Sequence, residues 1–365
     1  MAKLGEVCLL KAGKFVSPND ISPEYNKGLY PCFGGNGIRG YVADYTHDGE
    51  FPLIGRQGAL CGNVNLASGK FHATEHAVVV QPKIEMNVHW LYYALNAMNL
   101  GQYATGAAQP GLAVSKLETL SIEIPNISEQ NKIAQTLYKV EQLVNFRKQQ
   151  LAKLDELVKA RFVEMFGTFP ANPFRWSIGK IQDVVSDVRY GSSRPAVEGG
   201  KYPYLRMNNI TYSGELDLRD TKRIDIPDSE LDKCTVRRGD VLFNRTNSKE
   251  LVGKTCVYNR DELMVLAGFV IRVRINERIR PEVLSAFLNM DFSKRMLIGM
   301  CKTAIGQANI NAKELQNIDL YIPPIELQDQ FVTLKNKIDQ QKQTVQQSLE
   351  KLELLKKALM QEYFG

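Results

Sequence analysis

Two glycine-containing segments of the sequence place side chains where an enzyme could bind a cofactor or a phosphate. The first, FGGNG (33–37), superficially resembles the glycine loop with which amino-methyltransferases approach their cofactor. Such an enzyme also needs an Asn/Asp-Pro-Pro-aromatic segment to hold the target amine. The only Pro-Pro of the chain, in IPPI (322–325), lacks that pattern. We therefore interpret 33–37 as a turn.

The second segment, SKELVGKT (248–255), departs from a phosphate-binding loop at one essential position. Gly253, Lys254 and Thr255 match the end of that motif, but Ser248 replaces the first glycine, which must allow a tight turn. The chain also contains no GxSxG and no Glu-x-Lys, the signatures of a serine hydrolase and of a Mg²⁺-dependent nuclease. The sequence therefore predicts a chain that has no catalytic centre and binds no cofactor.

A larger group of polar side chains lies in glycine-rich loops of both halves, and its residue types suit the recognition of DNA. Arg, Asn, Gln, Ser and Thr form hydrogen bonds with base edges or bind phosphates. The residues that we expect to contact DNA are Asn36, Arg39, Arg56, Gln57, Gln109, Arg194, Arg206, Asn208, Asn209, Arg245, Thr246, Asn247, Ser248 and Gln307.

The distribution of charge also favours a polyanionic partner. The net charge is +6. Residues 168–314 carry 24 basic and 18 acidic side chains, which equals the whole excess, whereas residues 1–125 carry 9 basic and 10 acidic ones. A basic segment is the electrostatic signature of nucleic-acid binding.

An internal repeat determines how these loops are organised. Residues 117–167 and 315–365 align without a gap at an offset of 198, with 17 identities over 51 positions. The same offset places Thr105 and Gln109 on Thr303 and Gln307. Each copy predicts a strand that ends in a proline, followed by one long helix without Pro or Gly until its last residue.

The two predicted helices each carry a single apolar stripe. In the first helix, which we expect over 128–166 with Ser128 as its N-cap, apolar residues recur at alternating steps of three and four from Ile133 to Met165. The second helix repeats this pattern from Phe331 to Leu359. Such stripes are typical of a coiled coil, between two chains or within one. Because one chain holds two related helices, we favour antiparallel pairing within the chain.

The remaining segments mix short apolar runs with helical patterns. The runs FPLIG (51–55), HAVVVQ (76–81), DVLFN (240–244) and GFVIRVRI (268–275) predict strands, and residues 89–99 and 281–297 predict helices. The fold class is therefore α+β. We predict a globular domain over 1–125, a helical spacer over 126–167, a second globular domain over 168–314, and a strand end with a second helical spacer over 315–365.

Cysteine, histidine and hydropathy patterns point to a cytoplasmic chain without a metal. The six cysteines are scattered and form no CxxC, as expected for free thiols. His72 and His76 would share a metal only on a helix, and the segment after them predicts a strand. No apolar run is long enough to span a membrane, and the N-terminal residues lack the pattern of a signal peptide.

With this order of domains and helices, the chain closely resembles the specificity subunits of type I restriction-modification enzymes. The resemblance rests on the duplicated architecture, on the IP-x-I-x-x-Q lead-in to each helix, and on the segments GRQGALCGNV (55–64), ATEHAVVV (73–80) and RTNSKELVGKT (245–255). It implies that 1–125 and 168–314 are target-recognition domains, each of which reads one half of a bipartite site in double-stranded DNA.

The resemblance also implies the partners of the chain. The helices would set the spacing of the half-sites and hold two methyltransferase subunits, which would bind S-adenosylmethionine and methylate adenine. A motor-nuclease subunit would complete the restriction complex. Two alternatives remain open from the residues alone: a free-standing sequence-specific DNA-binding protein, and a coiled-coil scaffold for protein partners.

Overall fold

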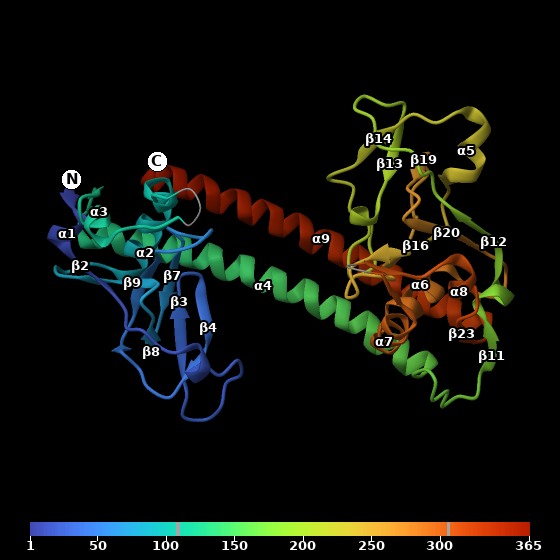
Figure 1. The fold of residues 1–365 in the computed structure, drawn as a ribbon, viewed down its shortest axis with the longest axis horizontal. Helices are drawn as coiled ribbons and strands as arrows, with labels where there is room; N and C mark the ends of the chain where they lie inside the picture. Colours follow the sequence, from blue (N-terminus) through green and yellow to red (C-terminus); the bar gives the residue numbers. More distant parts are fainter. Residues whose placement is uncertain (107–109, 305–306) are drawn as a thin grey trace. The chain divides into compact units, whose positions relative to one another are not determined.

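A computed structural model describes residues 1–106, 110–304 and 307–365 of the chain (Figure 1). It divides into two compact units. Unit 1 comprises Met1–Lys148 and Gln347–Gly365, and unit 2 comprises Gln149–Gln346. The long helices α4 (Ile127–Phe166) and α9 (Ile325–Phe364) each contribute one part to each unit.

Unit 1 contains two four-stranded sheets. The first is antiparallel, in the order β2 (Cys8–Ala12), β9 (Ala77–Pro82), β6 (Phe51–Gly55) and β7 (Val64–Ala67). The second has the order β4 (Gly37–Val42), β3 (Tyr30–Gly34), β8 (Lys70–Ala73) and β5 (His47–Asp48), with β3 parallel to β8. A short pair joins β1 (Ala2–Lys3) to β10 (Ser121–Ile122).

Helices complete the core of unit 1. They are α1 (Leu4–Val7), α2 (Val88–Ala97), α3 (Val114–Glu118) and the 3₁₀ turns η1 (Pro18–Asp20) and η2 (Leu100–Tyr103). The side chain of Asn87 caps α2 by accepting a hydrogen bond from the backbone N of Trp90. Trp90 and Leu137 of α4 are both buried in one apolar cluster, so α4 is part of the core of this unit.

Unit 2 repeats the strand order of unit 1. Its first sheet is β12 (Val185–Tyr190), β20 (Val270–Ile275), β16 (Val241–Asn244) and β18 (Thr255–Val257). The second is β14 (Lys222–Ile224), β13 (Tyr202–Leu205), β19 (Met264–Leu266) and β15 (Thr235–Val236). As in unit 1, only one neighbouring pair of the second sheet, β13 with β19, is parallel.

Further elements of unit 2 surround these sheets. The short strands are β11 (Ser177–Lys180), β17 (Thr246–Asn247), β21 (Lys302–Ala304), β22 (Gln307–Asn309) and β23 (Asp319–Ile322). The helices are α5 (Asp228–Cys234), α6 (Pro281–Asn289), α7 (Asp291–Met300), α8 (Ala312–Gln316), η3 (Ile181–Val184) and η4 (Met207–Asn209). The core joins Phe287 of α6 to Phe162 and Phe166 of α4 and Phe331 of α9.

The duplication therefore extends through the globular parts, where the sequence comparison did not detect it. The parallel pair Phe33–Ala73 of unit 1 corresponds to Leu205–Leu266 of unit 2. The difference in residue number between the units is smaller at these strands than in the long helices, and it differs from one strand pair to the next. Connections between strands have therefore changed in length, and an alignment at one constant offset cannot follow such changes.

The long helices run in opposite directions where they contact each other within a unit. In unit 1, Lys356 Nζ of α9 donates to Glu141 Oε1 of α4 at 2.7 Å, and Glu353 of α9 pairs with Lys148 of α4 at 3.1 Å. In unit 2, Lys342 of α9 pairs with Asp155 of α4. In unit 1, the second contact lies further along α4 and earlier along α9, so the two helices run antiparallel there, as expected from the stripes.

Two expectations about helix boundaries were wrong. The N-cap of α4 is Asn126, whose side chain accepts from Glu129 N at 3.0 Å, and Ser128 lies inside the first turn. The helix expected over 281–297 is divided into α6 and α7, because Met290 adopts an extended conformation between them. The amide of Asn289 donates to Thr255 O at 2.6 Å and fixes the end of α6 on the sheet.

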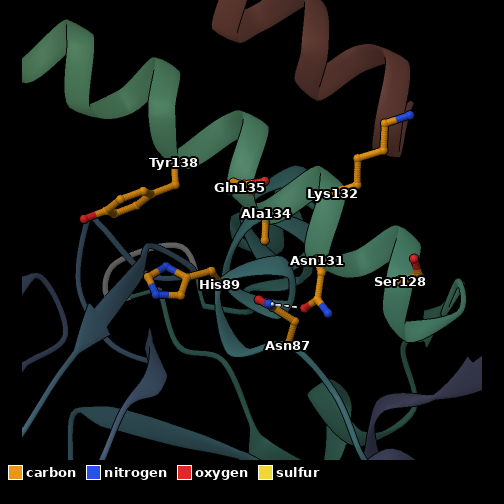
Figure 2. Close-up of a pocket in the computed structure, with 8 residues that line it drawn as sticks. All are labelled: Asn87, His89, Ser128, Asn131, Lys132, Ala134, Gln135 and Tyr138. Carbon is orange, nitrogen blue, oxygen red and sulfur yellow. Dashed lines mark hydrogen bonds between the residues drawn. The ribbon is translucent and has the colours of Figure 1, made fainter.

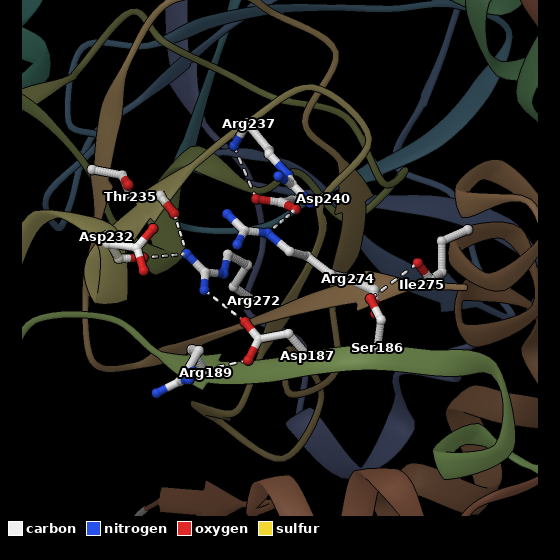
Figure 3. Close-up of polar contacts among 10 residues, drawn as sticks. All are labelled: Ser186, Asp187, Arg189, Asp232, Thr235, Arg237, Asp240, Arg272, Arg274 and Ile275. Carbon is white, nitrogen blue, oxygen red and sulfur yellow. Dashed lines mark hydrogen bonds and ion pairs between the residues drawn. The ribbon is translucent and has the colours of Figure 1, made fainter. Parts of the chain in front are cut away.

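The central strand β20 carries two arginines on one face, although its sequence predicts an apolar strand. Arg272, only 2% exposed, donates to Asp187 Oδ2 at 2.7 Å and to the backbone oxygens of Asp232 and Thr235 (Figure 3). Arg274 pairs with the buried Asp240 at 3.0 Å. These contacts connect the first sheet to α5 and β15 of the second. Each charge of this group has a partner, which offsets the cost of burying it.

In the described residues, no helix is both long and apolar enough to cross a membrane.

Candidate nucleic-acid interface

In unit 1 the structure brings the predicted loops 33–37 and 55–57 together. A Cβ atom on Gly55 would lie 2.0 Å from the backbone O of Gly35, so only glycine allows this close approach. The exposed side chain of Asn36 accepts a hydrogen bond from Asn63 Nδ2 at 3.0 Å. Asn36 therefore lies beside the loop that follows β6, which carries Arg56 and Gln57.

Arg56 and Gln57 follow directly after the buried strand β6. The backbone N of Arg56 donates to His76 O at 3.0 Å, and the backbone O of Arg56 accepts from Leu112 N at 2.9 Å. Gln57 is exposed and forms a β-bridge with Gly111. Arg39, also exposed, lies on β4 with its aliphatic carbons against Gly34. Gln109 lies outside the described residues.

In unit 2 the predicted segment 245–248 also follows a buried strand, β16. The guanidinium carbon of Arg245 lies 4.8 Å from the centre of the Tyr190 ring, within range of a cation–π contact, and Nη1 is 3.4 Å from Gly268 O. Tyr190 in turn accepts a hydrogen bond from Ala312 N at 2.8 Å. Arg245 is therefore held between an aromatic ring and a backbone carbonyl.

The following residues belong to a small sheet of β17, β22 and β21. Thr246 Oγ1 donates to Asn309 Oδ1 at 2.9 Å, and Asn247 Oδ1 accepts from the backbone N of Ser248 at 2.9 Å. Gln307 begins β22, so its backbone belongs to the same sheet. The structure thus brings the predicted segments around 246 and 307 together.

Three other predicted residues of unit 2 are already engaged within the fold. Arg194 pairs through two hydrogen bonds, of 2.7 and 3.2 Å, with Glu230, and Arg206 Nη2 donates to Asp220 Oδ2 at 2.8 Å. Asn209 is 2% exposed, and its amide donates to Asp217 O. We therefore leave Asn209 out of the interface. Asn208 is exposed and remains available to a ligand.

The sequence reasoning missed the residues that hold the predicted ones in place. Tyr190 supports Arg245, Asn63 bonds to Asn36, and Asn309 bonds to Thr246. One signal was present: Gly111 and Asn309 are equivalent at the offset of the helical repeat, so the pairing of Gln57 with Gly111 and of Thr246 with Asn309 reflects the duplication. Contacts of this kind depend on the tertiary fold and have no local pattern.

Two buried lysines hold the 245–255 segment in place through hydrogen bonds to backbone oxygens. Lys254 Nζ donates to Met207 O at 3.0 Å, and Lys294 Nζ of α7 donates to Gly253 O at 2.6 Å. Burial lowers the pKa of Lys294 to about 7, and the positive charges of Lys254 and Lys159 add to this effect. Burial likewise lowers the pKa of Lys254. The described residues contain no group of three or more His, Cys, Asp or Glu side chains that could hold a metal ion.

A groove of about 570 Å³ lies on the helix side of unit 1 (Figure 2). It is lined by α4 and by the start of α2, where Asn87 Nδ2 donates to Asn131 Oδ1 at 2.7 Å. The rings of His89 and Tyr138 meet edge to face across it, with their centres 5.5 Å apart. The lining also includes Lys132, so the groove combines aromatic rings, neutral amides and one cationic side chain.

Comparison with known proteins gives a consistent result for both halves of the chain. Residues 1–156 and 175–354 match the family described as "Type I restriction modification DNA specificity domain". The EcoprrI specificity subunit of Escherichia coli is 52% identical over 143 residues, which are 39% of this chain and 36% of that protein. The EcoKI specificity subunit of Escherichia coli K12 is 22% identical over 340 residues, which are 89% of this chain and 68% of that protein.

Two solved structures share the fold. The S subunit of a type I restriction-modification system from M. genitalium has a TM-score of 0.64 at 17% identity, over 100% of this chain and 95% of that one. A chain from a study of complex assembly and conformational transition of the type I R-M system has a TM-score of 0.56 at 17% identity, over 100% and 96%. The predicted mixed fold with two domains and long helices is confirmed. The first relative named above is matched over only about a third of its own length.

Proposed function

Because the chain belongs to the type I restriction-modification DNA specificity family, we propose that it directs such a complex to a bipartite site in double-stranded DNA. Specificity subunits confer sequence specificity and are not catalytic themselves. The globular part of each unit reads one half-site. Methylation belongs to methyltransferase subunits, which bind S-adenosylmethionine, and cleavage belongs to a motor-nuclease subunit.

One observation carries this proposal: the same constellation occurs twice. Both units have the same strand order, and in both an arginine followed by a polar residue leaves the third strand of the first sheet. Exposed asparagines, Asn36 and Asn208, lie in the loop after the second strand of the other sheet. Two equivalent polar surfaces in one chain are what a reader of two separate half-sites requires.

The long helices supply the surface for the methyltransferase subunits. Large apolar side chains of α4 in unit 1 are solvent-exposed, namely Tyr138 (45%), Leu143 (46%) and Phe146 (58%). Tyr138 also lines the groove of Figure 2. Exposed apolar side chains next to a groove favour a protein partner over a nucleic acid. The exposed side of α4 in unit 1 therefore suits docking of another subunit.

The experiment that tests this function is methylation mapping of DNA after assembly with a cognate methyltransferase subunit. We expect the full chain plus that subunit to methylate adenines only within one split sequence that has two defined halves and an undefined spacer. The chain alone should neither methylate DNA nor bind S-adenosylmethionine in a calorimetric titration.

A second test, of the docking surface, is the double substitution Leu143→Ser and Phe146→Ser, which alters only exposed positions of α4. It should weaken co-purification of the methyltransferase subunit at least tenfold and leave the melting temperature unchanged. Two results would contradict the proposal. One is methylated sites that have no sequence in common, and the other is a chain that binds a specific DNA sequence but does not bind the methyltransferase subunit.

A further inference from the structure

We propose that Arg56 and Arg245 are equivalent base-reading residues, each of which recognises a guanine in its own half-site. This inference rests on the proposed function and adds to it the identity of a recognised base. The offset of the helical repeat does not relate Arg56 to Arg245. Their equivalence follows from the contacts of the backbone.

Each arginine is fixed at the same place in the fold by the same pair of hydrogen bonds. The backbone N donates to the residue before the second strand of the sheet, which is His76 for Arg56 and Phe269 for Arg245, at 3.0 Å in both units. The backbone O accepts from Leu112 N in unit 1 and from Ile310 N in unit 2, at 2.9 Å in both. Leu112 and Ile310 are themselves equivalent positions at the offset of the helical repeat.

The two side chains also share a similar environment. Both are half-buried, and the Nε atom of each is enclosed without a hydrogen-bond partner. Over the described ranges, neither guanidinium has a carboxylate within ion-pair distance, whereas Arg194 and Arg206 both do. Burying half of a cation without a counter-charge is unfavourable, unless an acceptor on a ligand forms hydrogen bonds with it.

The remaining donors determine which acceptor fits. With Nε enclosed, the terminal amino groups of each guanidinium are the donors that remain for a ligand, and their spacing matches the O6 and N7 atoms of guanine in the major groove. A phosphate could also accept from them, but it requires no fixed plane. The Tyr190 ring, whose centre lies 4.8 Å from the guanidinium carbon of Arg245, restricts the orientations that this guanidinium can adopt. The neighbouring Thr246, Asn247 and Gln57 are residues of the types that read base edges.

Tyr190 acts as a positioning residue in unit 2 alone. It pairs with Ile271 as Ala12 pairs with Val78, so Ala12 is its counterpart in unit 1. Arg56 therefore has no ring at the equivalent position. We expect discrimination by Arg245 to be stricter than discrimination by Arg56.

The test uses the full chain assembled with its methyltransferase subunit and maps methylated sites for Arg56→Ala, Arg245→Ala, Arg56→Lys and Arg245→Lys. We expect each Ala variant to lose discrimination about 5- to 150-fold at one base pair, since a bidentate contact contributes about 1–3 kcal/mol. In the native site, that base pair should contain a guanine. It should lie in one half-site for Arg56 and in the other half-site for Arg245. The Lys variants keep the charge but not the paired donors, and should relax the same base pairs.

Three controls make each result decisive. Arg238→Ala, at an exposed arginine of unit 2 that pairs with Asp261, removes the same charge and should leave the recognised sequence unchanged. Tyr190→Leu should relax the base pair assigned to Arg245, and Tyr190→Phe, which keeps the ring, should not. Melting curves and co-purification identify any variant that fails to fold, and the Lys variants then replace the Ala variants.

Several results would overturn the inference. The inference would be refuted if an Ala variant lost discrimination at a base pair that contains no guanine. It would also be refuted if both variants lost discrimination within the same half-site. Uniformly weaker methylation with an unchanged sequence would assign the arginines to phosphates instead. If the native complex methylates one split sequence and the variants do not relax it, only this inference fails. If the native complex has no split sequence, the proposed function fails.

Discussion

Gln130 and Gln328 make two equivalent hydrogen bonds at the start of the two long helices. Gln130 Oε1 accepts from Asn87 N at 2.9 Å, and Gln328 Oε1 accepts from Arg280 N at 2.8 Å. Each Nε2 donates at 2.8 Å to the proline oxygen five residues earlier. Both side chains are almost fully buried, so each amide ties a long helix to the helix beside the recognition sheets.

Replacing Gln328 by Leu should therefore destabilise unit 2. The backbone groups of Arg280 and Pro323 would remain buried without partners, at a cost of about 1–3 kcal/mol for each group. Thermal or urea unfolding measures the effect. The exposed Gln341 of the same helix provides the matched control, and Gln341→Leu should change stability by less than about 0.5 kcal/mol. Equal effects of both substitutions would disprove the structural role of the amide.

The second prediction concerns the arginines of β20 (Figure 3). Arg272→Met should cost roughly 2–4 kcal/mol, because it removes three hydrogen bonds from a side chain that is 3% exposed. Arg189→Met is the control: Arg189 bonds to the same Asp187 but is 52% exposed, and its removal should cost much less stability than that of Arg272. The unfolding free energies of the two variants decide the matter, and a reversed order would refute the assignment.

The third prediction concerns the pH dependence produced by Lys294. Its pKa is about 7 in the folded protein and 10.5 in its unperturbed state, so between these values the unfolded chain binds more protons. The stability contribution of this site should therefore increase as pH rises from about 7 to about 10. Lys294→Met removes the titration, and Gly253 O still accepts from Thr255 Oγ1.

The measurement is the difference in unfolding free energy between Lys294→Met and the native chain at several pH values. The advantage of the variant should be greatest near pH 7 and decrease by up to about 1.4 kcal/mol per pH unit above it. Lys249→Met, at an exposed position, should show no such trend. A constant difference across this range would show that Lys294 does not titrate there.

The fourth prediction concerns the contact of Gly55 with Gly35. Gly55→Ala places a methyl group where the backbone O of Gly35 lies, so the loop that carries Asn36 must move. We expect the free energy of unfolding to fall by at least about 2 kcal/mol. We also expect methylation to become less selective for the half-site that unit 1 reads. Gly299 of α7, whose Cβ would meet nothing within 4 Å, is the control, and Gly299→Ala should be neutral or slightly stabilising. A fully stable Gly55→Ala protein would contradict the close approach.

Much of the architecture was accessible from the sequence, because long helices and apolar strands follow local periodicity. The first helix was expected over 128–166 and is Ile127–Phe166, and the strand expected over 51–55 is β6 itself. The division at Met290 was not foreseen, since it depends on a hydrogen bond from Asn289 to the distant Thr255. Local patterns carry no information about such a contact.

The interface was less accessible, because residue type does not reveal whether a polar group is already bonded within the fold. Arg194 and Arg245 both occur in glycine-rich loops and look alike in sequence. Only the structure distinguishes them: Arg194 is paired with Glu230, whereas Arg245 rests on Tyr190 without a carboxylate partner among the described residues. The remaining predicted contacts stay predictions until the complex with DNA is tested.

The unequal offsets of the duplication indicate where this chain can change its length during evolution. Between the halves, connections in the sheets have lengthened or shortened, yet the segments 117–167 and 315–365 have kept one register throughout. One added residue rotates everything after it on a helix by about 100° and would separate pairs such as Lys356 and Glu141. Loops between strands carry no such penalty. New recognition surfaces can therefore arise by insertion or exchange in the sheets while the helical frame is inherited intact.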